Sequence, residues 1–150
     1  MQSSDFEKLV EAYLLYDRST LVAPQFLIRV AGKDRFIDTL AVQLRERVFF
    51  LVEVTENRRP AKLARKVKDI HSNSSWLADR LKLDFGLDGA WKVMPWLFIR
   101  KDADEAFKKA LSGIIYKRTF IEDLVLSRVN PSLTLNSEIW GALVEPSTED

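Results

Sequence analysis

Residues 35–55, RFIDTLAVQLRERVFFLVEVT, decide the fold that this sequence predicts. Two strongly apolar, β-branched runs, 36–44 and 48–55, flank a polar turn at residues 45–47, which indicates two adjacent strands. Each run carries one carboxylate among its apolar residues, Asp38 in the first and Glu53 in the second. A buried carboxylate costs roughly several kcal/mol unless a cation or hydrogen bonds compensate it. Two such acids on neighbouring strands therefore indicate a functional site.

The chain before this stretch predicts a helix and one more strand. Ser4 and Glu7 are spaced as a capping box, and apolar residues then recur at helical spacing to about residue 16. A loop is expected at 22–25, a strand at 26–30 and a hairpin turn at 32–35. The three strands together form a predicted antiparallel meander.

The chain after this stretch predicts a long helix from Pro60 to about residue 81, a turn at 84–89 and a strand at 91–99. Because that strand follows a long helix, we expect it to join the sheet in parallel through a right-handed crossover. Capping boxes at Asp102/Glu105 and Thr119/Glu122 predict helices to about residues 115 and 129. Residues 133–144 fit either a strand or a short helix.

The predicted fold class is therefore α/β, with a mixed central sheet (a three-strand meander plus a parallel strand) flanked by helices. A length of 150 residues predicts a single domain. Its core is expected at about 4–115, followed by a helical C-terminal extension at 116–144 and a frayed tail at 145–150.

Composition excludes several classes of site. The chain has no cysteine, so disulfide scaffolds, thiolate zinc sites and cysteine nucleophiles are excluded. Its one histidine, His71, excludes sites that need two, and a packed or surface role is expected for it. The N-terminus lacks the pattern of a signal peptide, and no apolar run approaches the ~20 residues of a membrane span. We expect a cytoplasmic protein with no membrane partner.

The two carboxylates and the basic residues that follow them fit metal-assisted phosphate chemistry. Mg²⁺ is usually held by one or two carboxylates together with water and substrate phosphate. Between residues 58 and 68 the chain is basic and has no acid, and its cations are Arg58, Arg59, Lys62, Arg65, Lys66 and Lys68. Net charge is only +1, so this local cluster is the basis for expecting phosphate contacts.

At these residues the chain resembles a known family. Glu7 on a first helix, Asp38 in an Ile-Asp-Thr strand and the run Glu53-Val54-Thr55 resemble the PD-(D/E)XK nuclease superfamily, which has the restriction-endonuclease-like fold. The order of elements over about residues 4–115 resembles that family's layout. The sequence departs from the family at Ile37, where proline is common, and at Thr55, where the family has a lysine.

The resemblance implies a metal-dependent endonuclease that hydrolyses DNA phosphodiester bonds as a homodimer or higher homo-oligomer. Mg²⁺ (or Mn²⁺) would be held by Asp38 and Glu53, and Glu7 would complete the catalytic set. Lys62 or Lys66, from the following helix, would replace the missing lysine. The expected nucleic-acid contacts come from Arg58, Arg59, Lys62, Arg65 and Lys66.

Other interpretations of the same residues remain open. Asp38 could cap a bulge or pair with Arg35 or Arg45, and capping alone explains Glu7. Lys62 and Lys66 could be a solvated helix flank, and the tryptophans are most simply core or interface residues rather than base-stacking platforms. Thr55 favours an alternative function: a nuclease-like fold without catalysis that binds nucleic acid or protein. A third hypothesis is a subunit that needs a partner chain.

Overall fold

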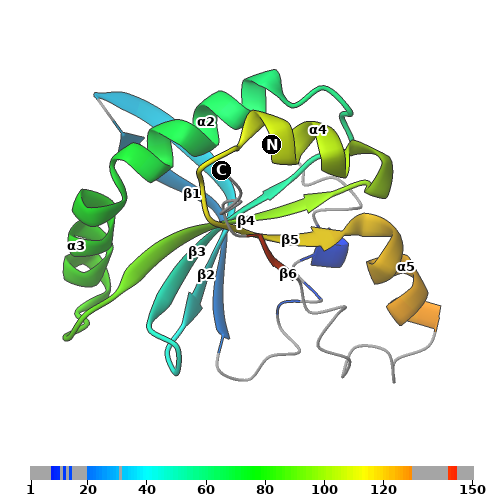
Figure 1. Ribbon diagram of the computed structural model, residues 1–150. Helices are drawn as coiled ribbons and strands as arrows, with labels where there is room; N and C mark the ends of the chain where they lie inside the picture. Colours follow the sequence, from blue (N-terminus) through cyan, green and yellow to red (C-terminus); the bar gives the residue numbers. More distant parts are fainter. Residues whose placement is uncertain are drawn as a thin grey trace.

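A computed structural model of the chain describes residues 8–10, 12, 14, 20–30, 32–129 and 142–144. Within them, strands form one six-stranded sheet in the order β1-β2-β3-β4-β5-β6 (Figure 1). The first three strands form an antiparallel meander: β1 (Thr20–Val30), β2 (Lys33–Gln43) and β3 (Val48–Val54). Next, β4 (Lys92–Ile99) pairs parallel with β3, and β5 (Tyr116–Phe120) pairs parallel with β4. Finally, β6 (Ala142–Val144) pairs antiparallel with β5.

Helices cover both faces of this sheet. One face carries α2 (Ala61–Ser72), α3 (Ser74–Phe85) and α4 (Asp104–Ala110), and α4 follows the short 3-10 turn η1 (Lys101–Ala103) (Figure 1). Apolar side chains of α2 and α3 pack on β2 and β3, and those of α2 and α4 pack on β4. The other face carries α5 (Ile121–Val129) and the helical residues 8–10, 12 and 14. Leu14, Leu124 and Trp96 belong to the core cluster on that face.

The structure confirms the α/β class, the antiparallel meander and the parallel strand that follows a helical crossover. The predicted long helix is instead two helices, because it is interrupted at Asn73. The side-chain amide of Asn73 donates to the backbone carbonyl of Asp69 (2.8 Å), in a run of serines and asparagine at 72–75. Such short polar side chains compete for backbone hydrogen bonds, so they end helices that an apolar stripe alone would continue.

The first hairpin is longer than the sequence predicts. β1 begins at Thr20 and includes Pro24, where a loop is expected. Because β1 is an edge strand, it needs hydrogen bonds on one side only, and proline is tolerated there. The turn is correspondingly shorter: β2 already begins at Lys33, and Gly32 has a φ of +76°, in the left-handed region that favours glycine.

The C-terminal third differs most from the prediction. The expected helix to residue 115 ends at Ala110, and residues 116–120 form strand β5, so a helical extension starting at residue 116 is wrong for these residues. The cap of α4 is Ala103, which makes no side-chain cap hydrogen bond. Thr119 lies within β5, where its hydroxyl accepts a hydrogen bond from the Trp96 indole (2.9 Å). Helix α5 ends at Val129, as predicted.

Three predicted features fall partly or wholly outside the described residues. These are the capping box of Ser4 and Glu7, most of the segment 133–144, and the tail at 145–150. In the segment 133–144, the described residues 142–144 form a strand.

Candidate functional site

Asp38 and Glu53 meet where the β2–β3 ladder ends. The last paired residues of this antiparallel register are Thr39 and Val52, and the next residue outward on each strand is one of the two acids. Beyond this point the backbone N–H of Val54 donates to Oδ2 of Asp38 (2.9 Å), so a side chain satisfies that donor. The hydrogen bond fixes the Asp38 carboxylate beside β3. Its alternative pairing with Arg35 falls outside the described side chains.

Lys66 brings the only described cation into contact with this pair of acids. Its Nζ lies 2.5 Å from Oε1 of Glu53, and it also donates to the backbone carbonyl of Phe36. Helix α2 buries Ala64 and Val67 against β4, and this orientation leaves Lys66 on the flank of the helix next to β3 and β2. The side chains are well buried, with 19% of Lys66 and 5% of Glu53 exposed.

The electrostatics of this cluster are unbalanced. Burial raises the pKa of Glu53 from 4.5 to about 8, and the negative charge of Asp38 raises it further, against the opposing effect of Lys66. Although Oε1 of Glu53 is close to Lys66, it makes no well-aligned hydrogen bond. One ammonium therefore faces two carboxylates, and near neutral pH Glu53 holds a proton. A divalent cation that bound here would displace that proton.

The structure separates the candidate lysines and arginines. Lys66 reaches the acids, whereas Lys62, one helical turn earlier on the same flank of α2, is exposed. Arg59 and Arg65 are also exposed. Arg58 lies 2.9 Å from Asp102 in an exposed ion pair, so its charge is partly balanced. Glu7, the third acid of the predicted set, lies outside the described residues.

Thr55, which stands at the family's lysine position, shapes the connection to α2. Its backbone N–H donates to the carbonyl of Phe98 (3.0 Å), and its hydroxyl accepts from the N–H of Asn57 (3.0 Å). The Asn57 side chain in turn accepts from the N–H of Arg59 (2.9 Å). Such side-chain turns are typical of threonine and asparagine in loops. Thr55 thus directs the chain towards the helix that carries Lys66.

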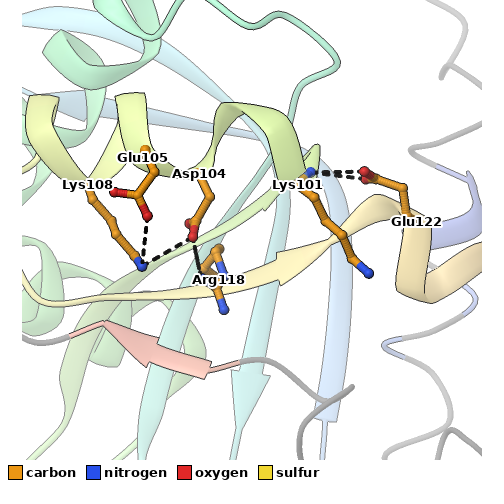
Figure 2. Close-up of polar contacts among 6 residues, drawn as sticks. All are labelled: Lys101, Asp104, Glu105, Lys108, Arg118 and Glu122. Atoms are coloured by element: carbon orange, nitrogen blue, oxygen red, sulfur yellow. Dashed lines mark hydrogen bonds and ion pairs between the residues drawn. The ribbon is translucent and has the colours of Figure 1, made fainter.

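A second buried acid, Asp104, was not predicted from the sequence. One guanidinium nitrogen of Arg118 donates to both carboxylate oxygens of Asp104 (3.0 and 2.9 Å), and Lys108 Nζ lies 3.3 Å from Oδ2 (Figure 2). Nearby, the backbone N–H of Lys101 donates to the Glu122 carboxylate (3.0 Å). These contacts join α4 to β5 and η1 to α5. The only sequence signal was the i,i+4 spacing of Asp104 and Lys108.

Metal ligation at the first cluster rests on its two acids. Within residues 8–10, 12, 14, 20–30, 32–129 and 142–144, no group of three or more histidine, cysteine, aspartate or glutamate side chains is placed to hold a metal ion. In the same part of the chain, no helix is long and apolar enough to cross a membrane.

Comparisons with known proteins give little further information. No family model matches the sequence, and no curated protein matches it. The crystal structure of a protein of unknown function, AF1548, is similar over 83% of this chain, with 17% identity and a TM-score of 0.45. The chain spans 66% of the length of that structure. A likeness at this level carries no argument about function.

Proposed function

We propose that this protein is a metal-dependent nuclease of the restriction-endonuclease-like fold that hydrolyses DNA phosphodiester bonds. The observation that carries the proposal is the convergence of Asp38, Glu53 and Lys66 from β2, β3 and α2. The described order of helix, meander, helical crossover and parallel strand supports the resemblance to the PD-(D/E)XK superfamily. Perturbed, buried titratable groups held together by a specific charge partner are typical of active sites.

The acids fit a hard divalent cation. Carboxylate oxygens are the ligands that Mg²⁺ and Mn²⁺ prefer, and Oε1 of Glu53 is a buried oxygen without an aligned hydrogen bond. Asp38 is oriented in advance by the Val54 N–H, which lowers the cost of arranging a ligand. When bound, the metal would supply an acidified water and charge stabilisation at the phosphate.

The chain's own residues would hold and orient the reacting groups. Glu53 would give up its proton as the cation bound, and Lys66 would then be free of its ion pair with Glu53. The Lys66 ammonium would remain within reach of the scissile phosphate and offset its developing negative charge. Lys62, Arg59 and Arg65 would contact flanking phosphates, and a homodimer would present two sites to two strands.

Cleavage assays test this proposal directly. Plasmid, branched and single-stranded DNA would be incubated with the protein and Mg²⁺ or Mn²⁺, with EDTA as the metal-free reference. We expect metal-dependent nicking or cleavage that is lost in the double variant Asp38→Ala, Glu53→Ala. The control variant is Asp79→Asn, which removes an exposed acid on α3 and should cleave like the wild type. Cleavage that survives in the double variant would overturn the assignment.

An inactive, nuclease-like binding module is the second candidate function. It is favoured by Thr55 at the family's lysine position and by the ion pair of Lys66 with Glu53, because a built-in cation can take the place of a metal. Calorimetry separates the two functions. Uptake of Mn²⁺ at millimolar concentration that Glu53→Gln abolishes supports the nuclease, whereas retained DNA binding without metal uptake supports the binding module.

A further inference from the structure

Two exposed apolar side chains lie side by side on the first hairpin. Leu27 on β1 and Phe36 on β2 are direct partners in the strand register. Their exposed fractions are 50% for Leu27 and 60% for Phe36, although both belong to the regular hairpin. Cross-strand partners bring their Cβ atoms to within about 5 Å, so the two side chains form one apolar surface. We call it the Leu27–Phe36 pad.

The pad borders the proposed active site. Phe36 precedes Asp38 by two residues on the same strand, so the two side chains project from the same side of β2, about 6–7 Å apart. The residue between them, Ile37, is fully buried. The carbonyl of Phe36 accepts a hydrogen bond from Lys66, the cation that also contacts Glu53. An exposed aromatic ring therefore lies next to both the acids and the ammonium group.

The surroundings of the pad identify the chemistry of its partner. Lys66 lies at its edge, and the exposed cations Lys62 and Arg65 stand on the same helix. A basic track beside an exposed aromatic ring is the arrangement by which proteins bind single-stranded nucleic acid: the cations follow the phosphates and the ring stacks on a base. A paired base inside a duplex has no free face for this contact, so it would first have to leave the stack.

We propose that the Phe36 ring stacks on an unpaired base next to the phosphate held at Asp38 and Glu53, so that the substrate class is nucleic acid with unpaired bases. This inference rests on the proposed nuclease function. Leu27 supports the ring from the neighbouring strand, and Lys66 links the ring's strand to the site. Because every base has a π-face, the contact selects single-stranded character rather than sequence.

Binding without cleavage tests the contact. Fluorescence anisotropy with single-stranded and duplex oligonucleotides of equal length, in EDTA, would be measured for the wild type and for Phe36→Ala, Phe36→Leu and Phe36→Trp. A 2-aminopurine in the single strand reports stacking by loss of its fluorescence, and an RNA single strand distinguishes DNA from RNA. The control variant Leu83→Ala truncates an exposed apolar residue on α3, 73% of which is exposed.

We expect Phe36→Ala and Phe36→Leu to weaken single-strand binding roughly 5- to 150-fold, the usual effect of losing one base–aromatic stack. Phe36→Trp should retain affinity and 2-aminopurine quenching, and Leu83→Ala should change neither. An abasic nucleotide at the quenched position should weaken wild-type binding but not binding by Phe36→Ala, because both changes remove the same contact. Phe36→Leu with full affinity and quenching would overturn the proposal, because an apolar contact without a π-face would then suffice.

A second copy of this chain is the rival occupant of the pad, since β1 is an edge strand. Light scattering that showed Phe36→Ala dissociating a dimer, with single-strand affinity unchanged, would assign the pad to self-association and overturn the proposal. The outcome is independent of the active-site assignment. Metal-dependent cleavage with no effect of Phe36 variants on the single-strand to duplex preference refutes only the stacking contact. Phe36-dependent binding without any cleavage refutes only the nuclease.

Discussion

Two buried acids in this protein lie in opposite electrostatic surroundings. Asp104 is one acid with two cations, Arg118 and Lys108, within 3.3 Å of its carboxylate. Glu53 is one of two neighbouring acids, and Lys66 is the cation that contacts it. The side chains of both acids are largely buried, with exposed fractions of 11% for Asp104 and 5% for Glu53.

The difference separates a structural ion pair from a candidate site. Partners compensate the charge of Asp104, and the contact joins α4 to β5. At Glu53 the compensation is incomplete, so the folded chain retains a proton there and has capacity for another cation. Incomplete compensation of this kind is retained in proteins mostly where it serves a function. The predictions below break or sharpen this comparison, from the largest expected effect to the smallest.

Removing the charge of Asp38 should abolish most of the proposed activity. We expect Asp38→Asn to lower metal-dependent DNA cleavage by about 10³-fold or more, equivalent to roughly 4 kcal/mol of transition-state stabilisation. Asp104→Asn, compared per mole of folded protein, should retain cleavage because it lies in the compensated cluster. Rates of plasmid nicking at saturating Mn²⁺ give the measurement. A larger loss in Asp104→Asn than in Asp38→Asn would reverse the assignment of the two clusters.

Breaking the compensated pair should cost more stability than breaking the uncompensated one. Arg118→Met leaves the buried Asp104 without its main partner, and we expect the free energy of unfolding to fall by about 3–5 kcal/mol. Lys66→Met should cost less, because Glu53 can stay protonated when its cation is gone. Urea unfolding in EDTA at pH 6 measures both. Equal losses would mean that Glu53 is ionised in the folded protein.

The raised pKa of Glu53 predicts a pH dependence of stability. Between pH 4.5 and about 8 the folded chain binds a proton that the unfolded chain does not, so the contribution of Glu53 is complete below pH 4.5 and is lost as the pH rises through about 8. Glu53→Gln removes this dependence. At pH 9 without metal the variant should be more stable than the wild type by roughly 2–4 kcal/mol. Urea unfolding from pH 5 to 9 gives the comparison, and parallel profiles would contradict the prediction.

The smallest expected effects concern the exposed cations. Lys62→Ala and Arg65→Ala should each weaken DNA binding by about 1 kcal/mol or less and reduce the slope of log affinity against log salt by about 1. Arg58→Ala should reduce the slope less, because Asp102 already pairs with that arginine. Titrations at several salt concentrations measure the slopes. A larger effect of Arg58 than of Lys62 would place the DNA on the loop rather than on α2.

Much of the central fold could be predicted from local patterns. The alternation of apolar residues and the polar turn at 45–47 place Asp38 and Glu53 on adjacent antiparallel strands, and a period of two residues brings them to the same end of the ladder. The basic stretch before the apolar stripe of α2 likewise predicts cations near this end. By contrast, β5 has only five residues, Tyr116 to Phe120, and mixed polarity, so its pattern is too weak to reveal a strand.

The sequence by itself determined the meander, the parallel strand after the helical crossover, and the two acids at one end of the β2–β3 ladder. Only the tertiary structure decided which lysine contacts them. Lys62 and Lys66 are equivalent in sequence, one turn apart on one flank, and the packing of Ala64 and Val67 on β4 determines that Lys66 reaches Glu53. It also decided that Thr55 serves the turn into α2 and that Asp104 is compensated by Arg118. Long-range packing sets these contacts, and no local pattern encodes the distance between side chains on different elements.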